Sequence, residues 1–385
     1  MASPHENLEM DFSEVEGKSY GCIDGCALCC LCQPELLAHE EREFRADTRL
    51  RESIADTHIS PEVRGAALKL QGKHGACHFL KGKRCGIYQN RPHFCRAFPI
   101  NIFVGWRIQV NANLSCRGMG GGGESLETLA RTVLADYENA ELGAELKAAR
   151  AVFAEFEANA RGAKVSQSPN SIRGAADALM DDLTDELGLS RTLTYAEHGR
   201  TRQNVPAADI ARFARRADAS ADVAERAMID GVELFDLDDL SLLPVYIDEA
   251  LQWRIFQLRG KDIVGLDLGE NGKTVETSRT DPSSVQLLPL AEGGRRAFKE
   301  YLRLVNRRDC FLGHAAHLCD LESYEYNFAQ VYVGAMANNA LDLWWRASFL
   351  AGLRGLDQLG ARELREGIVF FDMDLLDLPT IGAFI

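Results

Sequence analysis

The chain has 385 residues, of which 46% are hydrophobic and 26% are charged, and its formal net charge is −14. This composition is that of an ordinary globular protein long enough for two domains. Charged residues interrupt the apolar runs before the ~18–20 residues that a membrane span needs, and the acidic balance argues against general binding to nucleic acid.

Residues 1–20 form an acidic, polar segment that we expect to be a loosely ordered tail. The segment has neither the basic nor the apolar region of a signal peptide, which predicts a cytoplasmic protein. Because cytosolic thiols are kept reduced, a cysteine cluster there is more typical of a metal site or a reactive centre than of disulfides. The odd number of cysteines, eleven, also fits a disulfide framework poorly.

Nine of the eleven cysteines fall into two groups, the first on a turn-rich stretch and the second on short connections: Cys22, Cys26, Cys29, Cys30 and Cys32, then Cys77, Cys85, Cys95 and Cys116. Two groups of thiolates that converge in space form a tetrahedral metal centre, and all-sulfur ligation favours zinc or an iron–sulfur cluster. Nine thiols exceed the four of one site, and the adjacent Cys29 and Cys30 point in different directions. One or two centres are therefore expected.

A strongly basic segment surrounds the second group. Residues 63–123 contain ten Lys and Arg residues and no Asp or Glu, which gives this segment a charge of +10. Cations beside thiolates offset their negative charge and favour the form that binds metal. Alternatively, the basic residues and the aromatic residues between them bind an anionic partner such as RNA.

Periodicity predicts a hairpin and a long helix around the last cysteine of the second group. The hairpin strands are expected at 100–104 and 107–111. Ser125 is expected to cap a helical segment that continues, with a break at Gly143, to about residue 160. The polar segment 161–171 then predicts a linker, so residues 21–160 are expected to form a small, irregular, metal-centred domain together with the following helix.

We expect residues 172–385 to form a larger domain, whose role the sequence does not indicate. Residues 251–279 alternate with a two-residue period and contain the hairpin turn Asn271-Gly272, so we expect a three-stranded meander. Helices are expected on both sides of it, at 172–188, 207–216, 294–307 and 322–347. The predicted fold class is α+β, with a small cysteine domain and a larger domain built from the meander and helices.

The order of the motifs CALCC, then CHFLKGKRCGIYQNRPHFCRAFP, then a last cysteine resembles the YkgJ-type CxxCxxCC cysteine-cluster family, described as a zinc- or iron-chelating domain, over about residues 20–125. The resemblance implies eight metal ligands: Cys22, Cys26, Cys29, Cys30, Cys77, Cys85, Cys95 and Cys116. Cys22 departs from the pattern, because it precedes Cys26 by four positions where the family spacing is three, and Cys32 could replace it. One branch of the family resembles flagellin lysine N-methylases.

Other polar clusters have simpler explanations. A helical pattern of four residues could hold a second metal, although a packed helix with buried cysteines explains it better: Cys310, His314, His317 and Cys319. Three histidines among the thiols are expected to assist ligands rather than to ligate: His74, His78 and His93. Acidic pairs at 235–239 and 371–377 are more typical of surface turns than of metal sites.

These observations favour a metal-binding protein with zinc or an iron–sulfur cluster, acting as a binding or assembly module that meets a protein partner or substrate. The alternative is an iron–sulfur-dependent protein-modifying enzyme such as a lysine N-methyltransferase, for which the sequence identifies no catalytic residue. A second alternative is binding of RNA or another anion through residues 63–123, although nucleic acid is not favoured. No membrane partner is expected.

Overall fold

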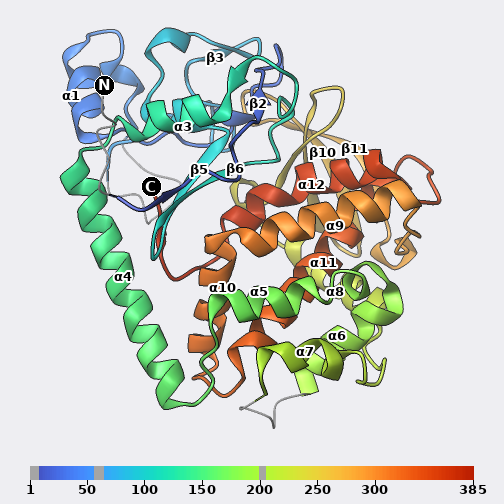
Figure 1. Cartoon of the computed structure of the whole chain (residues 1–385). Helices are drawn as coiled ribbons and strands as arrows, with labels where there is room; N and C mark the ends of the chain where they lie inside the picture. The colour runs from blue at the N-terminus through green and yellow to red at the C-terminus, as the bar shows by residue number, and fades with distance from the viewer. Residues whose placement is uncertain (1–7, 56–64, 199–204) are drawn as a thin grey trace.

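The computed structural model describes residues 8–55, 65–198 and 205–385 of the chain. In Figure 1 the N-terminal part, coloured blue to cyan, lies at the top, and most helices of the C-terminal part lie below it. The long helix α4 (Asn139–Gly162) runs down the left edge between the two parts. The predicted α+β class is confirmed. None of the helices in the described ranges combines the length and apolarity that crossing a membrane requires.

Short strands and single turns dominate the N-terminal part. In chain order its elements are β1 (Met10–Asp11), β2 (Ser19–Tyr20), η1 (Leu28–Cys30), α1 (Ala38–Ala46), η2 (Arg51–Ser53), β3 (Leu80–Lys81), β4 (Arg84–Cys85), η3 (Tyr88–Asn90), α2 (His93–Ala97), β5 (Ile100–Val104), β6 (Ile108–Ala112), β7 (Glu124–Ser125) and α3 (Leu126–Leu134). The predicted hairpin is present as β5 and β6, with Ile100 opposite Ala112.

Residues 8–20 are part of the fold, which differs from the loosely ordered tail expected for residues 1–20. β1 pairs in parallel with β6, β2 pairs with β7, and Val15 is fully buried. β1 and the C-terminal strand β12 (Ala383–Phe384) form the two edges of one sheet with the order β1-β6-β5-β12. Two-residue strands show no alternation in a sequence, which explains the difference. Residues 1–7 lie outside the described ranges.

The helical segment predicted after Ser125 is present as two helices, α3 and α4, but the break lies at residues 135–138 and not at Gly143, which is inside α4. The hydroxyl of Ser125 accepts a hydrogen bond from the N–H of Thr128, which confirms its capping role. The apolar face of α3 includes Leu126, Ala130 and Val133, and it packs on the inner residues of β5 and β6. This packing holds the segment that follows Cys116 against the N-terminal sheet.

The C-terminal part combines a four-stranded sheet with a helical body. Its elements are α5 (Pro169–Asp177), η4 (Asp182–Thr184), α6 (Glu186–His198), α7 (Ala207–Ala214), α8 (Val223–Phe235), η5 (Leu240–Leu242), β8 (Val245–Ile247), β9 (Trp253–Arg259), β10 (Asp262–Leu268), β11 (Thr274–Thr280), η6 (Pro282–Ser284), α9 (Glu292–Arg307), α10 (Asp309–Leu321), α11 (Phe328–Gly352) and α12 (Ala361–Leu376). The meander is confirmed as β9, β10 and β11, and β8 extends it to the order β11-β10-β9-β8.

Two predicted helix boundaries are wrong. The helix expected at 172–188 is divided between α5 and α6, and the helix expected at 322–347 begins at Phe328 and continues to Gly352. Gly188, which we interpreted as a helix end, lies in the first turn of α6, where a Cβ atom would be 2.5 Å from the carbonyl oxygen of Asp182. The glycine therefore permits close packing of the turn and does not end the helix.

The hydrophobic core of the C-terminal part extends into the cysteine-rich part. α11 is buried along most of its length, and α5, α6, α8, α10 and α12 pack around it. The same apolar cluster includes Cys26, Leu28 and Leu80 beside Trp253. Val165, within the expected linker, is fully buried. The division into domains stays a prediction, but the largest apolar cluster includes residues of both parts.

Candidate metal centre

Thiols from both cysteine groups line one cavity of about 350 Å³. Six cysteines do so: Cys22, Cys29, Cys30, Cys77, Cys85 and Cys95. All eleven cysteines of the chain are free, so disulfides do not explain the cluster. The structure therefore brings together thiols that lie far apart in the sequence, whereas the set of metal ligands stays a prediction.

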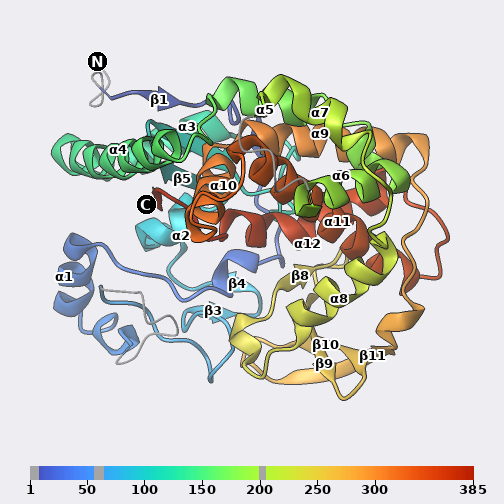
Figure 2. The same cartoon turned by 90° about the horizontal axis from the view of Figure 1, so that it is seen from below.

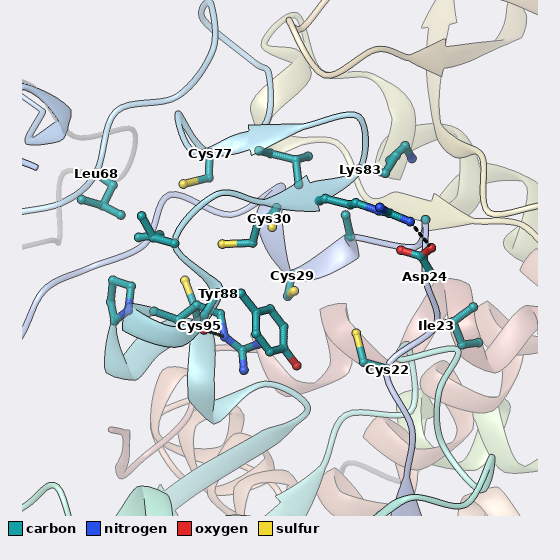
Figure 3. Close-up of a pocket in the computed structure, with 18 residues that line it drawn as sticks. Cys22, Ile23, Asp24, Cys29, Cys30, Leu68, Cys77, Lys83, Tyr88 and Cys95 are labelled. Carbon is teal, nitrogen blue, oxygen red and sulfur yellow. Dashed lines mark hydrogen bonds and ion pairs between the residues drawn. The ribbon is translucent and has the colours of Figure 1, made fainter. Parts of the chain in front are cut away.

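A tight turn orients the cysteines of the first group. Ala27 has φ 51° and ψ 27°, a left-handed conformation that costs a residue with a Cβ atom about 1 kcal/mol. The single 3-10 turn η1 follows, and the N–H of Cys30 donates to the carbonyl of Ala27 at 3.0 Å. In Figure 3 the side chains of Cys29 and Cys30, which end this turn, extend in different directions.

A backbone hydrogen bond joins the two groups, because the N–H of Cys77 donates to the carbonyl of Cys30 at 2.7 Å. The hairpin of β3 and β4 then pairs Leu80 with Cys85. Cys95 lies in the middle of α2. The hairpin and the short helix thus carry three thiols of the second group to the cavity that contains Cys30.

The turn between β10 and β11 supports the loop that carries Cys77 and Cys85. The carboxylate of Glu270 accepts hydrogen bonds from the N–H groups of Gly82 and Lys83, and its backbone carbonyl accepts one from Ala76 at 2.8 Å. Figure 2 shows the β3–β4 hairpin beside the sheet of β8, β9, β10 and β11. The C-terminal sheet therefore holds in place the backbone that carries Cys77 and Cys85.

Trp253, the first residue of β9, lies directly behind the first cysteine group. Its indole N–H donates to the carbonyl of Cys26 at 2.8 Å. The ammonium group of Lys83 lies 3.2 Å from the centre of the indole ring. One buried side chain thus contacts both cysteine-bearing segments.

Cys116 is brought towards Cys22 by a close approach of two backbones. The N–H of Gly21 donates to the carbonyl of Gly118 at 3.0 Å. A Cβ atom on Gly118 would lie 2.2 Å from the carbonyl oxygen of Gly21, so this approach requires glycine at position 118. The glycines at 120–123 continue this contact, since the N–H of Gly120 donates to the carbonyl of Ser19 at 3.0 Å.

Arg117 fixes the chain immediately after Cys116. Its guanidinium forms a buried ion pair with Glu366 of α12, and its Nε donates to the carbonyl of Ile247 in β8 at 3.0 Å. Tyr246 donates its hydroxyl hydrogen to the same carboxylate. The last thiol of the cluster is therefore anchored to both the sheet and the helices of the C-terminal part.

Burial determines the protonation of most thiols in the cluster. It raises the pKa of Cys77 to about 11 and that of Cys116 to about 12. Cys29 behaves differently: a hydrogen bond from the thiol of Cys30, aided by the charge of Arg91, lowers its pKa to about 7. At neutral pH Cys29 is the thiol that most readily becomes a thiolate, and the buried thiols need a cation to lose their protons.

The chemistry of the donor set fits a thiolate-bound metal. The thiols are free, several are shielded from water, and Lys83 and Arg91 line the same cavity and offset negative charge. Across residues 8–55, 65–198 and 205–385, no three His, Cys, Asp or Glu side chains are already spaced as ligands of one ion. Ligation would therefore require the sulfur atoms to move closer together.

Carboxylates from outside the basic segment neutralise half of its ten cations. Five of its cations form such ion pairs: Lys73 with Asp239, Arg84 with Asp24, Arg96 with Asp136, Arg107 with Asp309 and Arg117 with Glu366. Arg64 lies outside the described ranges. Much of the positive charge of residues 63–123 is therefore used in ion pairs within the fold, and less positive charge is left to bind an anionic partner.

The histidines near the thiols have other partners. Nδ1 of His93 lies 2.8 Å from Asp136, and Nε2 lies 3.0 Å from the hydroxyl of Tyr137, so both ring nitrogens are engaged. His74 faces a carboxylate oxygen at 3.3 Å. His78 packs edge-on against the neighbouring phenylalanine ring. These contacts stabilise the loops around the thiols.

The second candidate metal site is a packed helix. Cys310 and Cys319 of α10 are buried, and burial raises the pKa of each thiol to about 12. Nδ1 of His314 lies 2.7 Å from the carbonyl oxygen of Pro379. The acidic pairs are structural as well, because Asp372 pairs with a buried arginine and Asp239 caps η5.

Residues 21–117, which contain all eight predicted ligands, match a protein-family model. The model is CxxCxxCC, described as "Putative zinc- or iron-chelating domain". This match supports a zinc- or iron-chelating module over about a quarter of the chain. No curated protein and no solved structure matches the chain. The resemblance to flagellin lysine N-methylases finds no support in these comparisons.

Sequence reasoning missed the residues that support the CxxCxxCC domain from the C-terminal part, chiefly Glu270, Trp253 and Glu366. The turn at Asn271-Gly272 was identified as a hairpin, but nothing in its local pattern indicates that the adjacent Glu270 contacts a loop almost two hundred positions earlier. The surplus of basic residues in 63–123 was the one useful indication, because it predicts carboxylate partners elsewhere in the fold.

Proposed function

We propose that this protein binds zinc or an iron–sulfur cluster through the thiolates of its CxxCxxCC domain and acts as a binding or assembly module. The observation that carries the proposal is the cavity lined by six free thiols from both cysteine groups. Thiolates at such density favour a soft metal ion over magnesium or calcium.

The surroundings of the cavity support metal binding rather than thiol catalysis. A reactive cysteine is usually a single exposed thiolate near a base, whereas here several thiols lie together and burial raises the pKa of most of them. A metal ion would compensate for burial by replacing the protons.

A protein partner is the second element of the proposal. Ile23 and Tyr88 line the cavity and are 39% and 48% exposed, so a partner could approach the centre across apolar side chains. The helical C-terminal part would act as the rigid body that presents the centre.

Anaerobic purification followed by elemental analysis and an absorption spectrum tests metal binding. A colourless protein with stoichiometric zinc, or a brown protein with iron and acid-labile sulfide, would support the proposal and identify the metal. A folded protein that contains neither metal, and that takes up none from solution, would refute it.

Replacing Cys95 with Ser provides the matching variant. We expect Cys95→Ser to lower metal content sharply, because Cys95 lines the cavity. Cys319→Ser is the control, since this buried thiol lies in the hydrophobic core of the C-terminal part. Equal metal content in the two variants would remove Cys95 from the set of ligands.

A further inference from the structure

We propose that the eight cluster thiols form two separate four-thiolate metal centres, one held by Cys22, Cys26, Cys29 and Cys116 and the other by Cys30, Cys77, Cys85 and Cys95. This assignment rests on the proposed metal-binding function and specifies its number of centres and their ligands.

The second set is assembled by backbone contacts among its own members. Cys77 donates its N–H to the carbonyl of Cys30, and the β3–β4 hairpin returns Cys85 to the same side. Cys95 of the short helix α2 lines the same cavity as Cys30, Cys77 and Cys85. In Figure 3 the sulfur atoms of Cys30, Cys77 and Cys95 lie on one side of Cys29.

The first set is assembled by different contacts. The approach of Gly21 to Gly118 brings Cys22 and Cys116 together. The N–H of Cys26 donates to the carbonyl of Ile23 at 3.1 Å, so a tight turn holds Cys26 close to Cys22. Figure 3 shows Cys22 on the opposite side of Cys29 from Cys30, Cys77 and Cys95.

The boundary between the two sets falls at the adjacent pair Cys29 and Cys30. In Figure 3 the sulfur atom of Cys29 lies between that of Cys22 and those of Cys30, Cys77 and Cys95. The backbone hydrogen bond from Cys77 ties Cys30 to the second set, which leaves Cys29 for the first set. Neighbouring residues at the end of a tight turn direct their side chains differently, so one can serve each centre. This division uses each of the eight thiols that the family resemblance implies once, and it leaves Cys32 as a spare.

The test is the metal content of full-length variants purified anaerobically, with one ligand removed from each set. We expect Cys116→Ser and Cys85→Ser each to retain half of the metal of the unmodified protein, and the double variant to retain none. Cys32→Ser is the matched control and should retain all of it. Loss of all metal in either folded single variant, or of none in one of them, would overturn the two-centre assignment.

A second measurement covers variants that fail to fold. In the unmodified protein, metal is withdrawn stepwise with a chelator while free thiols are alkylated and located by mass spectrometry. Two centres predict that protection is lost in two blocks of four thiols with the membership given above. A single protected block of four, with the other thiols alkylated from the start, would refute two centres and leave metal binding intact. An unmodified protein that takes up neither its native metal nor cobalt(II) would instead refute the proposed function.

Discussion

A cysteine becomes a metal ligand as a thiolate, and in this fold its immediate neighbours determine how readily it does so. Cys29 has a hydrogen-bond donor in the next residue and a cation nearby, and its pKa is lowered to about 7. Cys77 and Cys116 are surrounded by apolar groups, and burial raises their pKa values to about 11 and about 12. Metal binding would therefore begin with one ready thiolate and continue by expelling protons.

This difference predicts a strong pH dependence of metal affinity. The buried thiols are protonated at neutral pH and must release protons when they bind, so acidification favours the metal-free protein and affinity rises as pH rises. Competition with a chromophoric chelator between about pH 6 and pH 9 measures the effect. An affinity that is the same throughout this range would show that the ligands are already thiolates.

A single methyl group should disrupt the contact that holds Cys116. In Gly118→Ala the new Cβ atom would lie 2.2 Å from the carbonyl oxygen of Gly21, so the two backbone segments must separate. We expect a loss of about 1–3 kcal/mol in the free energy of unfolding and reduced metal content. Gly174→Ala is the control, because its Cβ meets no atom within 4 Å in helix α5 and should be neutral or stabilising. Denaturant unfolding that finds both variants alike would contradict the close approach.

At the scale of elements, the turn between β10 and β11 forms hydrogen bonds that hold the loop that carries Cys77 and Cys85 in place. Its Glu270 satisfies the backbone N–H groups of Gly82 and Lys83 at the tip of the β3–β4 hairpin. Because this hairpin has only two residues per strand, its own hydrogen bonds are too few to keep it ordered. The sheet of the C-terminal part supplies the missing support.

Glu270→Ala should loosen this hairpin. We expect a destabilisation of about 1–2 kcal/mol, since two hydrogen bonds to a carboxylate are lost, and faster transfer of metal to a chelator. Glu276→Ala is the control on strand β11, where the carboxylate pairs with Arg279 on the surface. Thermal unfolding measures the loss of stability, and the rate of metal transfer to a chelator measures the loosening. Identical behaviour of the two variants would show that the hydrogen bonds of Glu270 do not hold the hairpin.

The elements that sequence reasoning predicted are those with a local pattern. The β5–β6 hairpin, the meander and α9 show clear periodicity. The odd number of cysteines, in a chain expected to be cytosolic, predicts that the thiols are free. The two-residue strands β1 and β12 have no pattern of their own, because their order comes from pairing with β6 and β5. The contacts of Arg117 with Glu366 and of Gly82 with Glu270 could not be predicted either, since a contact between distant positions produces no local pattern in a single sequence.

At the scale of the whole molecule, the buried side chain of Arg308 connects both ends of the chain. It forms ion pairs with Glu14 at 2.9 Å and with Asp372 of α12 at 2.7 Å, and it donates to the carbonyl of Ala112 in β6 at 2.8 Å. The N-terminal sheet, α12 and the start of α10 thus meet at one guanidinium. The cysteine-rich part is therefore integrated with the helical part.

Arg308→Met tests this integration. Removing one partner of a buried ion pair leaves two carboxylates without a counter-charge, so we expect a loss of about 3–5 kcal/mol in stability. Arg296→Met is the control, because this arginine pairs with Glu292 on the exposed face of α9 and should contribute less than about 1 kcal/mol. The midpoint of urea unfolding distinguishes the two. A small shift for Arg308→Met would mean that the two parts are held together elsewhere.

The position of Trp253 gives the protein an optical reporter of its own. Its indole group touches the backbone of Cys26 and lies under the ammonium group of Lys83, at the wall between the sheet and the sulfur atoms. A coloured iron cluster at such short range would quench the emission of this side chain, whereas colourless zinc would leave it bright. Subtracting the spectrum of a Trp253→Phe variant isolates that contribution from the other tryptophans, so fluorescence alone could follow loading and distinguish the two metals.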